Sequence, residues 1–254
     1  MADNKKERPV ALVTGAAQGL GAAIALRLAR EGYDLAVTRL HPEHLAEMAA
    51  QLEAIGARTL SLALDLRSQQ SIEQAVAQVA DTFGRIDVLV NNAAVTLHRH
   101  AIDVTREEWQ DIIDVNLTGT FFMSQQFARF LIGRKSSGCI VNLASTHGVV
   151  ALAERSTYGI AKAGLIHMTR MLAFEWAGHG IRVNAVAPGT VDTPTRTAYF
   201  NARPGSREAM VQRVPMGRFA TLDEVAGAVA YLAGPDGGFI TGQTLLLDGG
   251  LTIY

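Results

Sequence analysis

The feature that most constrains the fold of this chain is the regular alternation of short apolar segments with longer amphipathic ones. Strands are expected at 10–14, 34–38, 59–64, 86–91, 138–145, 181–187 and 243–248. Helices are expected at 19–31, 43–55, 68–83 and 157–178, with one more after the segment 109–114. Such alternation favours parallel strands joined by right-handed crossovers, with helices on both faces. We therefore expect an α/β fold with a doubly wound parallel β-sheet.

Length and composition indicate one domain. The chain has 254 residues, 48% of them hydrophobic, which is enough for a large core. Because there is no internal repeat, low-complexity tract or linker, we expect a polar tail over residues 1–9 and a single domain over residues 10–254. The long stretch 190–216 is rich in Pro, Gly, Thr and Arg and is expected to be irregular. Loops of that length are usually lids or binding loops, so we expect a substrate lid at 190–216.

Charge, cysteine content and hydropathy argue against several classes of protein. The net charge of −1 gives no electrostatic reason to expect a nucleic-acid partner. The single cysteine, Cys139, cannot form an intramolecular disulfide and is expected to be a buried thiol. No apolar run reaches membrane-spanning length, and the polar start precedes an apolar stretch too short for a signal peptide. We expect a cytoplasmic protein without a membrane partner. None of the seven histidines has metal-ligand spacing, so no metal is expected.

A glycine-rich turn joins the first expected strand to the first expected helix. It reads T-G-A-A-Q-G-L-G and runs from Thr14 to Gly21. Glycines let the backbone turn tightly and approach a pyrophosphate, while the helix N-terminus offers free N–H donors and the positive end of its dipole. The turn therefore predicts dinucleotide binding, and the strand before it and helix after it strengthen that prediction.

Tyr158 and Lys162 are spaced for acid–base chemistry. Four residues apart on a helix, their side chains share one face. A free tyrosine titrates near pH ~10, and a fixed cation nearby favours the phenolate and lowers its pKa. A surface helix carrying this pair by chance is the alternative, since the spacing alone is common. The other motifs make the chemical interpretation the stronger one.

Taken in order, these motifs resemble the short-chain dehydrogenase/reductase family over nearly the whole chain. The resemblance depends on the glycine turn, N-N-A-A at 91–94, D-V-N-L around Asn116, Ser145 after I-V-N-L-A, the Tyr158/Lys162 pair, and P-G at 188–189. The thirteen-residue spacing from Ser145 to Tyr158 and the C-terminal I-T-G-Q to D-G-G segment also fit. One departure is Ala94, where the family usually has glycine, which affects cofactor fit rather than catalysis.

The resemblance implies a Rossmann-type fold, a nicotinamide cofactor and a catalytic set. Tyr158 exchanges a proton with the substrate oxygen, and Ser145 hydrogen-bonds and orients that oxygen. Lys162 lowers the pKa of Tyr158 and reaches the nicotinamide ribose. Asn116 holds a water that passes protons from Lys162 to solvent. The alternative for Asn116 is an asparagine at a helix kink that satisfies backbone groups.

The resemblance also implies the cofactor contacts. Asp65 and Leu66 are placed for the adenine, and Val191 and Thr193 for the nicotinamide carboxamide; the alternative for Asp65 is an N-cap of the helix after Arg67. Asn92 and Ala93 are placed for the adenosine side. The full expected set is Gly15, Gln18, Gly19, Leu20, Gly21, Thr38, Arg39, Asp65, Leu66, Asn92, Ala93, Ala94, Tyr158, Lys162, Pro188, Gly189, Val191 and Thr193.

The residue at the end of the second strand predicts which nicotinamide cofactor is used. In the family, an acid there binds the adenosine ribose of NAD and repels the extra phosphate of NADP. This chain has Arg39, whose guanidinium can pair with a 2′-phosphate, so NADP is expected. NAD is the alternative, because Gln18 is neutral where many NADP enzymes carry a second basic residue.

Segments expected to border the substrate carry many cations and few acids. They contribute His98, Arg99, His100, His147, Arg155, Arg196, Arg203 and Arg207. A pocket for a fatty chain or steroid should be chiefly apolar. We therefore expect a small polar substrate, a sugar or polyol with or without a carboxylate, phosphate or sulfonate, bound by Ser145, His147, Tyr158 and Arg196. The alternative is that these cations lie outside and solvate the lid.

Two further functions share these motifs in whole or in part. A 3-oxoacyl-thioester (acyl-carrier-protein) reductase would use every motif named here. A non-catalytic cofactor-binding regulator would be expected to lack Tyr158 or Lys162.

The helix after Tyr158 predicts self-association. One apolar stripe is formed by Ala161, Leu165, Met168 and Leu172, and a second by Ile160, Gly164, Met171 and Phe174. A helix on a sheet needs only one stripe. The second is expected to be covered by the same helix of another subunit, and the resemblance extends this to a homotetramer. Coverage by a neighbouring helix of the same chain is the alternative.

Overall fold

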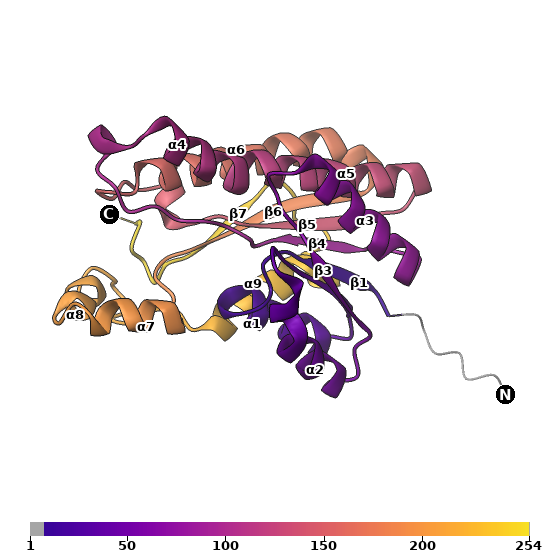
Figure 1. Cartoon of the computed structure of the whole chain (residues 1–254), viewed down its shortest axis with the longest axis horizontal. Helices are drawn as coiled ribbons and strands as arrows, with labels where there is room; N and C mark the ends of the chain where they lie inside the picture. The colour runs from indigo at the N-terminus through magenta and orange to yellow at the C-terminus, as the bar shows by residue number, and fades with distance from the viewer. Residues whose placement is uncertain (1–7, 254) are drawn as a thin grey trace.

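The computed structural model describes residues 8–253 and has a seven-stranded sheet at its centre (Figure 1). The strand order is β3-β2-β1-β4-β5-β6-β7, and every neighbouring pair is parallel. The strands are β1 (Val10–Val13), β2 (Asp34–Arg39), β3 (Thr59–Ala63), β4 (Val88–Asn91), β5 (Gly138–Leu143), β6 (Ile181–Pro188) and β7 (Thr244–Leu247). The predicted doubly wound, Rossmann-type sheet is confirmed. Residues 1–7 of the predicted polar tail lie outside the described residues.

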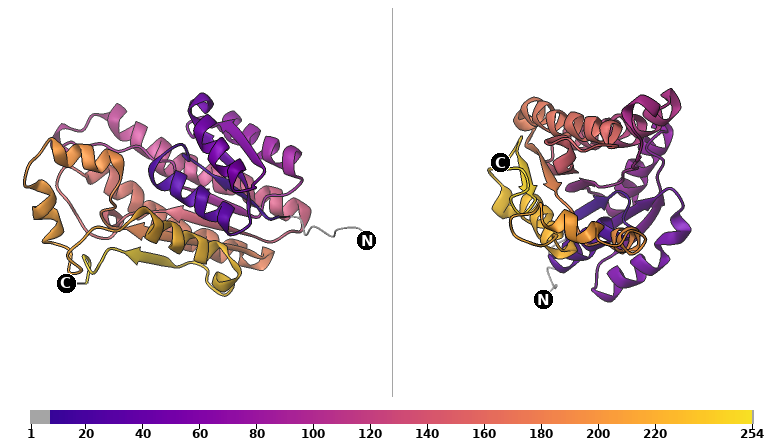
Figure 2. Two further views of the ribbon diagram at one scale, coloured as in Figure 1. Left: turned by 90° about the horizontal axis from the view of Figure 1, so that it is seen from below. Right: turned by 90° about the vertical axis from the view of Figure 1, so that its left-hand side faces the viewer.

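Helices cover both faces of the sheet (Figures 1 and 2). One face packs against α1 (Gly19–Arg30), α2 (Ala46–Ala54) and α9 (Leu222–Ala233). The other carries α3 (Gln69–Phe83), α4 (Arg106–Ile113), α5 (Thr120–Arg134) and α6 (Ser156–Trp176). Each strand contributes side chains to two hydrophobic cores, because successive side chains of a strand point to opposite faces of the sheet. In β1, Val10 and Leu12 join one core, while Ala11 and Val13 join the other.

The helix predicted after the segment 109–114 is confirmed as α5 (Thr120–Arg134), but the segment itself is also helical, which was not predicted. Thr105 and Glu108 form a capping box that starts α4 at Arg106. The chain continues through a π-helical turn, Asp114–Gly119, directly into α5. Only Ile112 of α4 is buried, so its apolar periodicity was too weak to predict a helix.

The stretch 190–216 is not irregular as expected. It contains α7 (Pro194–Asn201) and α8 (Ser206–Val211), which lie together at one end of the molecule (Figure 1). Both helices are short, and their loop-like composition concealed them. Helix α9 was not predicted either, although Thr221 and Glu224 form a capping box that marks its start.

Candidate active site

Two adjoining cavities lie beyond the carboxyl ends of the strands, where open parallel sheets bind ligands. The first, the glycine-turn cleft, has a volume of about 490 Å³ and is lined by Gly15, Gln18, Gly19, Thr38, Arg39, Asp65, Leu66, Asn92, Ala93, Ala94 and Thr193, among others. The second, the Tyr158 cavity, has a volume of about 220 Å³ and includes Leu20, Ser145, His147, Tyr158, Pro188, Gly189, Val191, Thr193 and Arg196. Thr193 lines both, so the two cavities adjoin. Most of the predicted site residues are therefore brought together.

The glycine turn has the backbone geometry that its sequence predicts. Gly15 and Gly19 adopt φ angles of +67° and +59°, in the left-handed region that favours glycine. A Cβ on Gly21 would lie 2.3 Å from the Gly15 oxygen, so the turn could not close around a larger residue. A Cβ on Gly19 would meet nothing within 4 Å, because that glycine borders the open cleft. The turn thus leaves room for a ligand against the backbone at the start of α1.

The end of β4 is tied to this turn. Asn92 Nδ2 donates to the backbone oxygens of Thr14 and Gly15 at 2.9 and 3.0 Å. The backbone N–H groups of Asn92 and Ala93 donate to Thr14 Oγ1, each at 3.0 Å. Ala94 has no positive φ, so its methyl group causes no backbone strain where the family usually has glycine.

The ends of β2 and β3 form the far wall of the cleft. Thr38 Oγ1 is buried there without a hydrogen-bond partner within the described part of the chain. Asp65 is not an N-cap, because Ser68 caps α3 by accepting a bond from Ser71 N. Asp65 instead accepts from the backbone N–H of Arg67 at 3.0 Å. The N-cap alternative for Asp65 is therefore wrong.

Tyr158 and Lys162 lie one turn apart on α6, beside the end of β5. Lys162 Nζ lies 5.6 Å from the centroid of the Tyr158 ring and donates to the backbone oxygen of Leu143 at 2.6 Å. Tyr158 shares a side-chain hydrogen bond with Ser145, whose Oγ also accepts from the backbone N–H of His147 at 3.2 Å. Phenol, ammonium and hydroxyl therefore meet at one point of the sheet edge.

Burial dominates the protonation of these groups. It lowers the pKa of Lys162 to about 8 and raises the pKa of Tyr158 above its ordinary value. The bond to Ser145 and the charges of Arg155 and Arg196 oppose the rise at Tyr158. The sequence predicts a lowered pKa for Tyr158, and this protein shows the reverse. The reason is that loss of water outweighs the nearby cations.

Asn116 lies in the π-helical turn between α4 and α5 and is 1% exposed. Its Oδ1 accepts from Val95 N at 2.9 Å, and its Nδ2 donates to Val95 O at 2.8 Å. The side-chain amide therefore satisfies backbone groups at a helix irregularity, as the alternative for this residue proposed. Val95 lines the glycine-turn cleft, so Asn116 fixes one wall of it.

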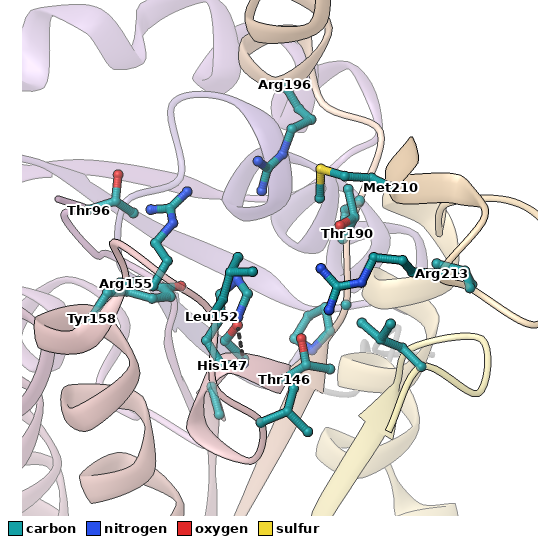
Figure 3. A pocket seen from close by; sticks show the side chains of 18 of the residues that line it. Thr96, Thr146, His147, Leu152, Arg155, Tyr158, Thr190, Arg196, Met210 and Arg213 are labelled. Atoms are coloured by element: carbon teal, nitrogen blue, oxygen red, sulfur yellow. Dashed lines mark hydrogen bonds between the residues drawn. The ribbon is translucent and has the colours of Figure 1, made fainter. Parts of the chain in front are cut away.

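Three arginines line the Tyr158 cavity (Figure 3). Arg155 was grouped with the basic residues around the substrate and Arg196 was predicted as a substrate contact, while Arg213 was missed. Arg213 lies just after α8, in a segment whose sequence has no motif, and only the path of the chain brings it to the cavity. Other predicted rim residues have acidic partners on the surface: Arg99 pairs with Glu108 and Arg207 with Asp192, and His100 Nε2 lies 3.1 Å from a carboxylate oxygen of Glu154.

His147 is a polar but uncharged part of this cavity. Burial, together with the charges of Arg155, Arg196 and Arg213, lowers its pKa to about 4. Its ring meets that of Tyr158 edge to face, with 6.2 Å between the centroids. At neutral pH it therefore contributes hydrogen-bonding atoms and no charge.

The described part of the chain shows neither a metal-ligand cluster nor a membrane-spanning helix. Over residues 8–253 no group of three or more His, Cys, Asp or Glu side chains is arranged to hold a metal ion. Over the same residues no helix combines the length and the apolar character needed to cross a bilayer.

Known proteins resemble this chain over its full length. A family model described as enoyl-(acyl carrier protein) reductase matches residues 15–252. A 3-oxoacyl-(acyl-carrier-protein) reductase of Thermotoga maritima is 36% identical over 97% of this chain and 99% of its own. A 3beta-hydroxysteroid dehydrogenase of Eggerthella lenta is 36% identical over 100% and 97%. A D-threitol dehydrogenase of Mycolicibacterium smegmatis is 38% identical over 99% and 95%.

Solved structures are also similar to this chain over nearly its whole length. A short-chain type dehydrogenase/reductase from Mycobacterium marinum has a TM-score of 0.91 at 31% identity, covering 97% of this chain and 96% of that one. Xylitol dehydrogenase bound to NAD⁺ has a TM-score of 0.90 at 33% identity, covering 97% and 100%. A variant of actinorhodin polyketide ketoreductase with NADPH has a TM-score of 0.90 at 37% identity, covering 97% and 98%.

Proposed function

The chain belongs to the short-chain dehydrogenase/reductase family, and from that premise we propose that it is an NADP(H)-dependent oxidoreductase acting on a small polar sugar or polyol. The reacting group is a secondary alcohol, a ketone or a sugar hemiacetal. One observation carries the proposal. Ser145 and Tyr158 form part of the wall of a small, cation-lined cavity that adjoins a glycine-turn cleft.

The catalytic residues divide the chemistry between them. The Tyr158 phenol exchanges a proton with the substrate oxygen, and the Ser145 hydroxyl hydrogen-bonds that oxygen and orients it. The nicotinamide, when bound, supplies or accepts the hydride. Lys162 places a buried positive charge near the phenol and favours its ionised form. We also propose that Asn116, whose side-chain amide is bonded to Val95, holds a water that passes protons from Lys162 to solvent.

The glycine-turn cleft fits a dinucleotide. It offers open backbone at Gly19 and the orphaned hydroxyl of Thr38 as a hydrogen-bonding group. We propose that Arg39 selects NADP(H), because its guanidinium lines the cleft and no carboxylate is paired with it among the described residues. Relatives use either cofactor: the xylitol dehydrogenase structure holds NAD⁺ and the ketoreductase structure holds NADPH.

Cavity size and lining favour a small polar substrate. The Tyr158 cavity, about 220 Å³, is smaller than the roughly 300–1,000 Å³ typical of sites for drug-sized ligands. Its wall carries three arginines, His147 and four threonines, together with apolar side chains such as Leu20, Leu152 and Met210. A steroid or long acyl chain would need a larger cavity. The D-threitol and xylitol dehydrogenases among its relatives show that this fold accommodates polyols.

Two alternative functions differ from the proposed one. Reduction of 3-oxoacyl thioesters is the second candidate, since a relative of 36% identity carries that name. A non-catalytic regulator is disfavoured, because Ser145, Tyr158 and Lys162 are all present and come together at the site.

The remaining proposals concern the domain, the lid, the cellular location and the oligomeric state. We propose residues 10–254 as one catalytic domain, with 190–216 as a lid over the cavity that carries Arg196 and Arg213. We propose a cytoplasmic homotetramer. In its support, Ile160, Met171 and Phe174 of the second α6 stripe are 51%, 49% and 89% exposed, so no neighbouring helix of the same chain covers them within the described residues.

A substrate screen tests the function directly. Purified protein would be assayed with sugars, polyols and acetoacetyl thioesters, each with NAD(H) and NADP(H). We expect the highest kcat/KM for a sugar or polyol with NADP⁺. Faster reduction of the thioester would favour the ketoreductase alternative, and no turnover of any compound would favour the regulator.

A further inference from the structure

A buried polar cluster lies in the core at the carboxyl ends of β4 and β5. This cluster, called the amide cluster below, consists of Asn91 of β4, Ser124 of α5, Asn142 of β5 and Thr169 of α6, each at most 5% exposed. Asn91 and Asn142 are register partners in the parallel pair β4–β5, so their side chains lie on the same face of the sheet. The proposed chemistry uses none of the four side chains.

Apolar side chains would be expected at the positions of the two amides. Side chains two residues apart on a strand share a face of the sheet. Leu89 and Ile140, two residues before Asn91 and Asn142, belong to the core that packs against α5 and α6 (Figure 1). The two amides therefore take the place of core residues. Burying an amide is unfavourable unless its hydrogen bonds are made, so this polar pair needs a reason beyond packing.

The hydrogen bonds of the amide cluster form one continuous chain. Asn91 Nδ2 donates to Ser124 Oγ at 2.9 Å and to Asn142 Oδ1 at 2.8 Å. Asn142 Nδ2 donates to Thr169 Oγ1 at 2.9 Å. The Ser124 and Thr169 hydroxyls donate to backbone oxygens of their own helices, each at 2.8 Å. Within the described part of the chain, no buried nitrogen or oxygen of these four side chains lacks a partner.

Asn142 and Thr169 join the strand and the helix that carry the catalytic residues. Asn142 lies three residues before Ser145, and Thr169 is on α6, the helix of Tyr158. Lys162 Nζ, which is bonded to the last residue of β5, forms a second polar link between the two elements. Lys162 and Thr169 are seven residues apart, about 10 Å along the helix. Two links at this separation prevent α6 from turning against β5 about a single contact.

Asn91 extends the amide cluster to the cofactor side of the site. The next residue, Asn92, donates to two backbone oxygens of the glycine turn. A displacement at the end of β4 would therefore move the wall of the glycine-turn cleft. The cluster thus connects this wall with Ser145, which follows β5, and with Tyr158 on α6.

We propose that Asn142 and Thr169 are positioning residues, which hold the Ser145 hydroxyl and the Tyr158 phenol in the arrangement that proton exchange with the substrate requires. Both lie outside the lining of the two cavities, so they act through β5 and α6. A satisfied buried polar network specifies one arrangement of its elements, whereas apolar side chains of similar size can repack. A misplacement on the order of 1 Å at the reacting groups can lower turnover by about 10²-fold. This inference deepens the proposed function and rests on it.

Variants at Thr169 test the inference by turnover. Thr169→Val removes the hydroxyl and keeps the shape, so the Asn142 amide loses its acceptor, while Thr169→Ser keeps the hydroxyl. With the best substrate of the screen, we expect kcat of Thr169→Val to fall by about 10- to 100-fold and kcat of Thr169→Ser to stay near the wild-type value. Cofactor affinity, measured by NADPH fluorescence, should change little because the bonds of Asn91 remain. Thr169→Ala removes the same hydroxyl and takes the place of Thr169→Val if that variant does not fold.

Val79→Ala is the control for a loss of stability. Val79 is fully buried in the same core, on α3, and lines neither cavity. Both Val79→Ala and Thr169→Val should lower the melting temperature, because one leaves a cavity and the other an unpaired amide. Only Thr169→Val should lower kcat of the folded enzyme.

A second measurement reports on Tyr158 without turnover. NMR of protein labelled with [ζ-¹³C]tyrosine follows the titration of each of the five phenols, and Tyr158→Phe identifies the signal of Tyr158. Burial raises the pKa of Tyr158, and the bond to Ser145 opposes that rise. Loosening of this bond in Thr169→Val should therefore move the Tyr158 titration to higher pH, with the other phenols unchanged. Val79→Ala should leave all five titrations unchanged.

The outcomes separate this inference from the proposed function. Unchanged kcat and an unchanged Tyr158 titration in folded Thr169→Val would overturn the positioning role and leave the oxidoreductase proposal standing. Equal losses of kcat in Val79→Ala and Thr169→Val would show general destabilisation and would also overturn it. A shifted Tyr158 titration in Thr169→Val, in a protein that turns over no compound, would support the positioning role and count against the oxidoreductase.

Discussion

Lys162 Nζ donates a 2.6 Å hydrogen bond to the backbone oxygen of Leu143, the last residue of β5. The bond ties the helix that carries Tyr158 to the strand that leads to Ser145. Both ends of this contact are buried, with Lys162 only 3% exposed. The lysine is therefore a structural link between the two halves of the catalytic set as well as a source of charge.

The first prediction concerns the pH dependence of stability. The pKa of Lys162 is about 8 in the folded protein, below its ordinary 10.5, because the ammonium is buried. Between those two values the unfolded chain binds more protons, so the free energy of unfolding rises with pH. In Lys162→Met this rise should be smaller, by on the order of 3 kcal/mol across the window. Urea unfolding of both proteins between pH 7.5 and 10.5 measures the difference, and parallel curves would contradict it.

The second prediction concerns catalysis. Tyr158→Phe removes the proton that the substrate oxygen exchanges, so turnover should fall by at least ~10²-fold. Folding and cofactor affinity should change little, since the ring and its contact with His147 remain. Tyr33→Phe is the control and should keep its activity, because Tyr33 directly precedes β2, at the amino ends of the strands. Retention of more than a tenth of the activity by the Tyr158→Phe variant would exclude Tyr158 as the acid–base group.

Most of this site can be predicted from the sequence, because the alternation of strands and helices implies a parallel sheet. The carboxyl ends of parallel strands lie at the same end of the sheet, so the glycine turn, Asn92, Ser145 and Pro188 come together there. The spacing of Tyr158 and Lys162 was sufficient to place both on one helix face. These predictions depend only on local periodicity and on the topology that it implies.

Other features depend on contacts that no local pattern encodes. Arg213 reaches the cavity only because α7 and α8 fold back over it, and both helices resemble loops in composition. The pKa of Tyr158 was predicted in the wrong direction because desolvation depends on the surrounding structure. The helix α9 could have been predicted from the capping box at Thr221 and Glu224.

The third prediction concerns cofactor choice. Arg39→Ala removes the guanidinium proposed to hold the 2′-phosphate, so kcat/KM with NADP⁺ should fall by about 10-fold or more, the scale of one charge-assisted contact. The value with NAD⁺ should change little. Arg67→Ala is the matched control, because Arg67 also lines the cleft but is paired with Asp111 and Asp65. A wild-type preference for NAD⁺ would show that Arg39 does not select the phosphate.

The last prediction concerns assembly. Phe174 is 89% exposed on α6, and Leu245 and Leu246 are each 40% exposed on the edge strand β7, so the chain presents two separate apolar surfaces. Two surfaces of this kind suit two two-fold axes, which generate a tetramer. We expect light scattering to give a tetramer at micromolar concentration. Phe174→Lys should dissociate it across the α6 contact, because a two-fold axis places the substitution on both sides of the interface. Ile102→Lys, at a position 92% exposed in the 3-10 turn Ala101–Asp103, adds the same charge outside the α6 stripe, and this control should remain tetrameric. A monomeric wild-type protein would contradict the proposed assembly, and an undissociated Phe174→Lys variant would move the interface to another surface.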